Sequence, residues 1–269
     1  MIRTRLAYHA PAELEEACSL LEARREGAAV LGGGTWLVPL MSRGERSLTD
    51  VVDLRRLGLA GVTEKDGHLE VGAMTTYADV LDSSAVRERA PLLHAIARGI
   101  TGGRQIHNVG TLGGSACFAF PASDVPAGLV ALDARLRVHG TAGTREIAAA
   151  DFFLDAFRCA LEPGEVLTAL IIPDRPRGVG YHKLKLCESS WPIATAAAVV
   201  TNGTAHVTLG GVARTPLRIE LDGQELDARI GERLDDPWDD ELAPGSYRQA
   251  VAPVIARRAL EQATKDGGR

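Results

Sequence analysis

The sequence predicts an α+β protein, in which helices combine with mostly antiparallel strands. Segments with the apolar spacing of helices alternate with short apolar runs of strand length. The dipeptides Asp66-Gly67 and Asn202-Gly203 each separate two such runs, which is the signal of a hairpin with a two-residue turn. Two glycine-rich loops follow apolar or turn-forming stretches, which indicates tight turns at the ends of regular elements.

The N-terminal elements form a compact unit. Residues 11–26 are expected to form a helix with Pro11 at its first position, acidic residues in its first turn and Gly27 at its end. Residues 28–31 then form a short apolar strand that runs into the first glycine-rich loop, and residues 51–54 form another strand.

The middle of the chain contains one long segment without regular periodicity. Residues 59–64 and 69–71 flank the first hairpin turn and are expected to pair, and residues 92–100 have the pattern of a helix. Residues 101–126 are low in charge and rich in Gly, Pro and Ser, so we expect a long irregular loop and place function there. Regular structure returns at residues 129–139, as a helical turn followed by a strand.

A charged, proline-containing segment at residues 174–178 is the best candidate for a linker. We therefore expect a first domain of residues 1–175, divided into two subdomains near residues 55–60. Residues 176–269 are expected to form a C-terminal domain.

The C-terminal domain is expected to hold a three-stranded antiparallel sheet and helices. Its last helix is expected to be capped by Ser246 and to be kinked at Pro253, unless that proline lies in the first turns. The three strands are expected at residues 181–186, 193–200 and 205–212.

Composition excludes several classes of function. A net charge of -5 and a pI near 5.8 leave no basic surface for nucleic acid. The apolar runs are far shorter than the ~20 residues of a membrane span, and the N-terminus has no apolar signal core, so we expect a soluble, cytoplasmic protein. Cys18, Cys117, Cys159 and Cys187 lack the short spacing of metal sites, so we expect no metal and reduced, mostly buried thiols.

The two glycine-rich loops, Gly32-Gly33-Gly34-Thr35 and Thr111-Leu112-Gly113-Gly114-Ser115, are consistent with two halves of one diphosphate cradle. Without Cβ atoms, consecutive backbone N–H groups can converge on an anion, and nearby hydroxyl groups add donors. Neither loop has the lysine of a P-loop or the spacing of a simple Rossmann domain, so both of those classes are disfavoured. A single loop of this kind is more simply explained as a tight turn, and the presence of two such loops weakens that explanation.

Segments along nearly the whole chain carry a resemblance to a known family. They are Leu31-Gly32-Gly33-Gly34-Thr35, Ile106-His107-Asn108-Val109-Gly110-Thr111-Leu112-Gly113-Gly114, Pro121-Ala122-Ser123-Asp124-Val125-Pro126, Asp151-Phe152-Phe153, Tyr181-His182-Lys183-Leu184-Lys185, Leu209-Gly210-Gly211-Val212-Ala213, and Tyr247-Arg248 ahead of Arg257-Arg258-Ala259-Leu260. In their order and spacing, the chain resembles the FAD-binding medium subunit of the molybdenum hydroxylases, the group that contains xanthine dehydrogenase and aerobic carbon monoxide dehydrogenase.

The resemblance implies a two-subdomain FAD-binding fold of the vanillyl-alcohol-oxidase-like type, with FAD as the cofactor. It assigns both glycine-rich loops to the FAD diphosphate, Asp124 to the nucleotide portion, and Lys183 to the pyrimidine edge of the flavin, where a cation stabilises negative charge. The structural alternatives are a turn or helix cap for Asp124 and an exposed strand lysine for Lys183. The residues assigned to cofactor binding are Leu31, Gly32, Gly33, Gly34, Thr35, Trp36, His107, Asn108, Thr111, Gly113, Gly114, Ser115, Asp124 and Lys183.

The implied function is that of an oxidoreductase subunit without catalytic side chains of its own. It would carry electrons on FAD from two-iron clusters of a partner to NAD, oxygen, a quinone or another acceptor. The implied partners are a large subunit with the molybdenum cofactor and a small iron–sulfur subunit, assembled as a dimer of heterotrimers. The scattered cysteines agree with this division, because the iron–sulfur sites would have to come from a partner.

The chain departs from the family pattern at several positions. Trp36 stands where a polar residue is frequent, His107 where arginine is common, and Ser115 where asparagine is frequent. Phe118 and Phe120 are unusual for a segment that tends to be polar, and they either line the flavin ring or belong to the core, which is the interpretation we favour.

Two other functions are compatible with these departures. One is a stand-alone flavin oxidoreductase on the same fold. The small size of the C-terminal domain argues against it, because that domain would have to form the substrate pocket. The other is a non-catalytic assembly or binding protein with an altered flavin pocket.

Overall fold

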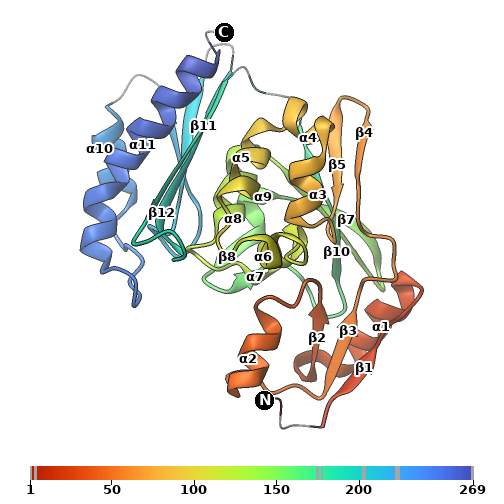
Figure 1. Ribbon diagram of the computed structural model, residues 1–269. Coiled ribbons are helices and arrows are strands. Elements are labelled where there is room, and N and C mark those ends of the chain that lie inside the picture. The colour runs from red at the N-terminus through yellow and green to blue at the C-terminus, as the bar shows by residue number, and fades with distance from the viewer. Residues whose placement is uncertain are drawn as a thin grey trace.

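The helices and strands form three groups, each built on one main β-sheet, and the second group also contains a two-stranded hairpin at residues 153–159 (Figure 1). This arrangement, in which helices pack against separate sheets, confirms the predicted α+β class. Among the described helices, none is long and apolar enough to cross a bilayer. The computed structural model describes residues 2, 5–173, 176, 178–201, 204–221 and 225–267.

The first group contains a parallel sheet in the order β1-β3-β2 and the first glycine-rich loop. The apolar face of the first helix, with Ala17, Cys18 and Leu21, packs against Val52 of this sheet and Leu54 just beyond it. The predicted helix and both predicted strands are present, together with an unpredicted first strand. The elements are β1 (Ala7–His9), α1 (Leu14–Arg24), the 3₁₀ turn η1 (Arg25–Gly27), β2 (Ala28–Leu31), α2 (Leu37–Arg43) and β3 (Asp50–Asp53).

The second group contains a five-stranded sheet in the order β4-β5-β10-β6-β7, whose neighbouring strands are antiparallel. The predicted hairpin at Asp66-Gly67 is confirmed, because Lys65 pairs with His68 across the turn. The elements are β4 (Val62–Lys65), β5 (His68–Gly72), α3 (Tyr77–Asp82), α4 (Ser84–Arg89), α5 (Pro91–Gly99), α6 (Arg104–His107), α7 (Leu112–Phe118), α8 (Asp124–Ala131), β6 (Arg135–Gly140), β7 (Gly143–Ala148), α9 (Ala149–Phe152), β8 (Phe153–Asp155), β9 (Arg158–Cys159) and β10 (Val166–Ile172).

The prediction of one long irregular loop at residues 101–126 was wrong. The segment contains α6 and α7 and the first residues of α8. Helix α7 begins with glycines, which have low helix propensity, so the local sequence does not indicate a helix. Tertiary packing decides instead, because Leu112 and Ala116 of this helix are fully buried in the large core.

The third group contains four antiparallel strands rather than the three predicted. The missed strand, β14, is only five residues long and two of them are charged, which hides its alternating pattern. One of those charges, Arg218, reaches the carbonyl oxygen of Val130 in α8. The elements are β11 (Gly178–Lys185), β12 (Pro192–Val200), β13 (Ala205–Gly210), β14 (Leu217–Leu221), α10 (Leu226–Arg233) and α11 (Gly245–Gly267).

Two sequence signals of this part of the chain fall largely outside the described residues. The predicted turn at Asn202-Gly203 is one, although Val200 and Ala205 on either side of it pair as expected for a hairpin. The predicted linker is the other, since residues 174, 175 and 177 are outside the described ranges. The proposed division into domains stays a prediction.

Helix α11 crosses the sheet of the third group and lies directly on β11 (Figure 1). It begins at Gly245, so Ser246 lies in its first turn rather than at its cap, and it continues through Pro253. Its contact with β11 depends on glycine, because a Cβ atom at Gly180 would lie 2.8 Å from the Ala263 nitrogen and closer still to the Ala259 carbonyl oxygen.

The same helix is tied to the sheet by a buried cation. Arg248 is fully buried, and its guanidinium donates hydrogen bonds to the carbonyl oxygens of Ile193, Gly211 and Ala243 and to Asp240. A buried charge is tolerated only where its hydrogen bonds are satisfied, as they are here.

We expect Gly180→Ala to destabilise the protein, because the added methyl group must push α11 away from β11. Overpacking of this kind costs about 1–3 kcal/mol in the free energy of unfolding. The matched control is Gly231→Ala in α10, where an added Cβ meets no atom within 4 Å. That change should stabilise the protein by about 0.5–1 kcal/mol through helix propensity. Urea unfolding followed by circular dichroism measures both, and equal effects of the two changes would contradict the packing argument.

Candidate functional site

The fold brings the two glycine-rich loops into direct contact. The first loop joins β2 to α2, and the second leads into α7. A Cβ atom at Gly33 would lie 2.6 Å from the carbonyl carbon of Val109 and 2.9 Å from the Cα of Gly110, so only glycine allows this approach. A Cβ at Gly32 would lie 3.1 Å from Thr111 Oγ1. The contact is therefore made by backbone against backbone.

The first loop carries backbone N–H groups that make no hydrogen bonds within the described residues. Over residues 5–173, no hydrogen-bond acceptor within the chain is found for the amide groups of residues 32–36. Gly34 has a φ of 70°, a left-handed conformation that favours glycine. A half-buried loop with several free amides is a group of donors suited to an anionic ligand. Leu31 at the end of β2 and Thr35 complete this loop.

The second loop is held by internal hydrogen bonds. The hydroxyl of Thr111 caps α7 by accepting from the Gly114 amide at 3.1 Å. The amides of Leu112 and Gly113 donate to the carbonyl oxygens of Thr75 and Ala73, and the Ser115 hydroxyl is paired with Tyr77. The amides of residues 112–115 thus all donate hydrogen bonds within the protein. Within residues 5–173, the amide of Thr111 has no acceptor. The unused backbone donors lie mainly in the first loop.

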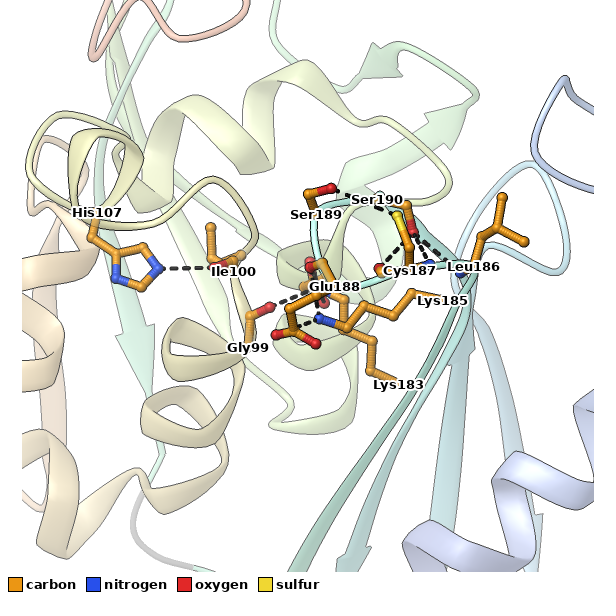
Figure 2. Close-up of polar contacts among 11 residues, drawn as sticks. Gly99, Ile100, His107, Lys183, Lys185, Leu186, Cys187, Glu188, Ser189 and Ser190 are labelled. Carbon is orange, nitrogen blue, oxygen red and sulfur yellow. Dashed lines mark hydrogen bonds and ion pairs between the residues drawn. The ribbon is translucent and has the colours of Figure 1, made fainter.

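His107 and Asn108 lie immediately before the second loop. The Nε2 atom of His107 is 2.9 Å from the carbonyl oxygen of Ile100, and Figure 2 shows the ring directed toward that residue. Its ring also meets Tyr77 edge-on, with centroids 6.3 Å apart. His107 is therefore satisfied by the protein, whereas Asn108 is exposed at the end of α6.

Asp124 and Lys183 form a buried ion pair between α8 and β11. Their closest atoms are 2.9 Å apart, and the side chains are 1% and 8% exposed. Lys183 also donates to the carbonyl oxygen of Gly99 at 2.7 Å, a contact visible in Figure 2, and Tyr181 donates its hydroxyl to Asp124. Burial raises the pKa of Asp124, and the opposing effect of Lys183 limits that rise. Burial and the nearby Asp124 raise the pKa of Tyr181 well above its usual value.

Five aromatic side chains cluster beside the first loop, and we call them the aromatic cluster. Neighbouring rings have centroids 4.6–6.0 Å apart, within the range of favourable ring contacts. None of the five is fully buried, and two of them, Phe157 and Trp191, are 50% and 37% exposed. The interpretation of Phe118 and Phe120 as core residues was therefore wrong. The cluster consists of Trp36, Phe118, Phe120, Phe157 and Trp191.

Several residues of this region were missed in the sequence. Tyr77 and Tyr181 hold Ser115 and Asp124, but their roles depend on contacts across 38 and 57 residues. Phe157 and Trp191 join the aromatic cluster from separate turns, and an isolated aromatic residue in a turn carries no signal of its partners. The motif that contains Lys183 could have indicated Tyr181, because alternate residues of a strand share one face.

Comparisons with known proteins agree along the whole chain. The family described as the FAD binding domain in molybdopterin dehydrogenase matches residues 3–175. The carbon monoxide dehydrogenase medium chain of Afipia carboxidovorans is 35% identical over 283 residues, with 98% of each chain covered. The xanthine dehydrogenase FAD-binding subunit of Escherichia coli O157:H7 is 31% identical, with 97% of each chain covered.

Solved structures show the same fold. A carbon monoxide dehydrogenase structure from Hydrogenophaga pseudoflava matches with a TM-score of 0.91 and 31% identity, covering 99% of each chain. Quinoline 2-oxidoreductase from Pseudomonas putida 86 matches with a TM-score of 0.88 and 25% identity, covering 99% of this chain and all of that one.

We expect Lys183→Met to make the stability of the protein more dependent on pH. The pKa of Asp124 is raised in the folded state, so its contribution to stability is present at low pH and is lost as pH rises through that pKa. Removing Lys183 removes the main opposing effect and raises the pKa of Asp124 further. Breaking a buried pair costs about 3–5 kcal/mol, and we expect the loss to be larger at about pH 8 than at about pH 5.

Urea unfolding at both pH values measures this difference. The double variant Asp124→Asn with Lys183→Met is the control, because it has no carboxyl group at this position and should not show the added dependence. A loss of equal size at the two pH values would contradict the proposed coupling.

Proposed function

We propose a function from the fact that this chain belongs to the family of FAD-binding domains of the molybdopterin dehydrogenases. It holds FAD where its two glycine-rich loops meet, and it carries electrons on that FAD within a larger complex. The resemblance inferred from its motifs is confirmed by the family match and by relatives above 30% identity. The chain is an FAD-binding medium subunit of a molybdenum hydroxylase, and thus a subunit of an oxidoreductase.

The contact between the loops fits the diphosphate of FAD, and this observation carries the proposal. A diphosphate needs several converging donors and close approach of the backbone. The free amides of residues 32–36 and the amide of Thr111 supply donors, and Gly33 leaves no side chain in the way. The hydroxyls of Thr35 and Thr111 can donate as well. The second loop then acts as the support that positions the first.

Lys183 is suited to the flavin edge that the family resemblance assigns to it. An ammonium group has three N–H donors, and Gly99 and Asp124 account for two of them. The remaining donor could stabilise negative charge that develops on the reduced ring. Asp124 has both carboxylate oxygens engaged by Tyr181 and Lys183, so we assign it to positioning Lys183 rather than to direct contact with the nucleotide.

The aromatic cluster provides an apolar surface for the ring system of the cofactor. Trp36 follows Thr35 directly, so this surface begins one residue after the diphosphate loop. When bound, FAD would supply redox chemistry that can collect electrons from one-electron carriers and deliver two of them to an acceptor. The protein contributes the apolar surface of the cluster and one buried cation.

We assign the remaining steps to partners. A large subunit with the molybdenum cofactor would oxidise the substrate, and a small subunit with two-iron clusters would pass electrons to this chain, in a dimer of heterotrimers. The described residues contain no group of side chains that could hold a metal ion, so an iron–sulfur site would be supplied in trans. The final acceptor would be NAD, oxygen, a quinone or another oxidant.

We expect Gly33→Ala to weaken FAD binding at least about tenfold, because the methyl group would separate the loops and displace the free amides. The matched control is Gly44→Ala at the end of α2, the helix that follows the first loop. Gly44 has a φ of 80° and no atom near an added Cβ, so this change should cost about 1 kcal/mol in stability but retain FAD. Titration of the cofactor-free proteins with FAD measures both. Normal binding by Gly33→Ala would argue against this location for the diphosphate.

We expect the FAD-loaded chain to accept electrons from its two-iron partner. In an anaerobic mixing experiment, a two-iron partner subunit reduced beforehand should bleach the visible absorbance of the flavin. An unrelated two-iron ferredoxin at the same concentration is the control and should react more slowly, because it lacks a complementary docking surface. Oxidation of an organic substrate by the isolated chain would instead support a stand-alone flavin oxidoreductase.

A further inference from the structure

Two cysteines that are 42 positions apart in the sequence lie on neighbouring segments that also carry Phe118 and Phe157 of the aromatic cluster. Cys117 is in the last turn of α7, and Cys159 ends β9. Helix α7 packs against β9, the two thiols interact with each other, and both are half-buried. This pair is distinct from the other thiols, because Cys18 is fully buried and Cys187 is exposed on a separate loop.

The backbone around the two cysteines holds them in register. The amide of Phe157 donates to the carbonyl oxygen of Ala119 at 2.9 Å, and these residues lie two positions from Cys159 and Cys117 respectively. Phe118 and Phe157, the neighbours of these segments, pack with ring centroids 5.3 Å apart. Both Ala119 and Phe157 have positive φ, at 48° and 60°, which is unusual for residues other than glycine. Backbone of this kind persists only where surrounding contacts hold it.

The two thiols are not equivalent. Interactions with Cys117 and with the backbone at Leu161 lower the pKa of Cys159 despite its burial and the nearby Glu165. The interaction with Cys159 and burial raise the pKa of Cys117. The proton of the pair therefore stays on Cys117, and Cys159 has the greater thiolate character, which is the state that reacts with oxidants.

We infer that Cys117 and Cys159 form a peroxide-sensitive pair that closes into a reversible disulfide, with Cys159 as the attacking thiol and Cys117 as the resolving thiol. This inference does not depend on the proposed role of the chain in electron transfer.

The chemistry of closure is balanced by hydrogen peroxide alone. The Cys159 thiolate attacks one peroxide oxygen, the O–O bond breaks, and the products are a sulfenic acid and, after protonation, water. The sulfur of Cys117 then attacks the sulfur of Cys159 and gives up its proton, and the sulfenic oxygen leaves as a second water. Two thiols are oxidised by two electrons to one disulfide while one peroxide is reduced.

Closure would link the end of α7 to the hairpin that carries Phe157. Helix α7 is capped by Thr111, the residue that packs against Gly32 of the first loop. The disulfide would therefore restrain the helix that supports both glycine-rich loops, and it would do so from the side of the aromatic cluster.

The test uses the purified full-length chain and hydrogen peroxide. After treatment, the protein is denatured, alkylated with iodoacetamide and digested, and the peptides are identified by mass spectrometry. We expect Cys117 and Cys159 to lose alkylation together and to appear as one cross-linked peptide that dithiothreitol separates. Cys18 should remain alkylated. Full alkylation of Cys117 and Cys159 after treatment would overturn the inference, and this measurement on the unaltered chain decides it without any variant.

Variants test the roles of the two thiols. In Cys117→Ser, the sulfenic acid on Cys159 should persist and be trapped by dimedone, whereas in Cys159→Ser the thiol of Cys117 should stay reduced. Cys187→Ser is the control and should cross-link like the unaltered chain. Dimedone labelling of Cys117 in Cys159→Ser would overturn the assignment of Cys159 as the attacking thiol.

Discussion

The close approach of Gly33 to the backbone of Val109 and Gly110 is the constraint on which the site depends. It joins the parallel sheet of the first group to the helices of the second at a place where no side chain could fit. The amides of the second loop donate hydrogen bonds to acceptors within the protein, so this loop is held in place. The first loop lies against it, and the amides of the first loop remain free. One backbone contact thus both connects two parts of the molecule and shapes the surface that we propose for the diphosphate.

The connection to the third group is of a different physical kind. There the link is a buried ion pair, with Asp124 on α8, Lys183 on β11 and Tyr181 completing the hydrogen bonds. A buried charge without its partner is costly, so the pair strongly favours one arrangement of the two elements. Arg248 acts in the same way inside the third group, where its four acceptors come from the sheet, its loops and the segment before α11.

The parts of the fold that could be predicted were those with local signals. The helix ending before Gly27, the Asp66-Gly67 hairpin and the first three strands of the third sheet follow from spacing and turn residues. Helix α7 and strand β14 could not, because glycines and charges mask their patterns and distant packing stabilises them. At the site, both glycine-rich loops were recognised and interpreted as two halves of one cradle, but the approach of Gly33 to the backbone of Val109 and Gly110 carries no signal in the sequence. The hydrogen bonds of Asp124 to Tyr181 and Lys183 and the position of Trp191 likewise depend on residues that are distant in the sequence.

The aromatic cluster has a spectroscopic consequence. The chain contains three tryptophans. Trp36 and Trp191 belong to the cluster, and Trp238 lies against Phe157 with ring centroids 6.4 Å apart. Every indole of the protein is therefore within or beside one surface, next to the first glycine-rich loop. Tryptophan fluorescence of this protein therefore reports mainly on that surface and only weakly on the sheets. Changes in it describe the site and not the molecule as a whole.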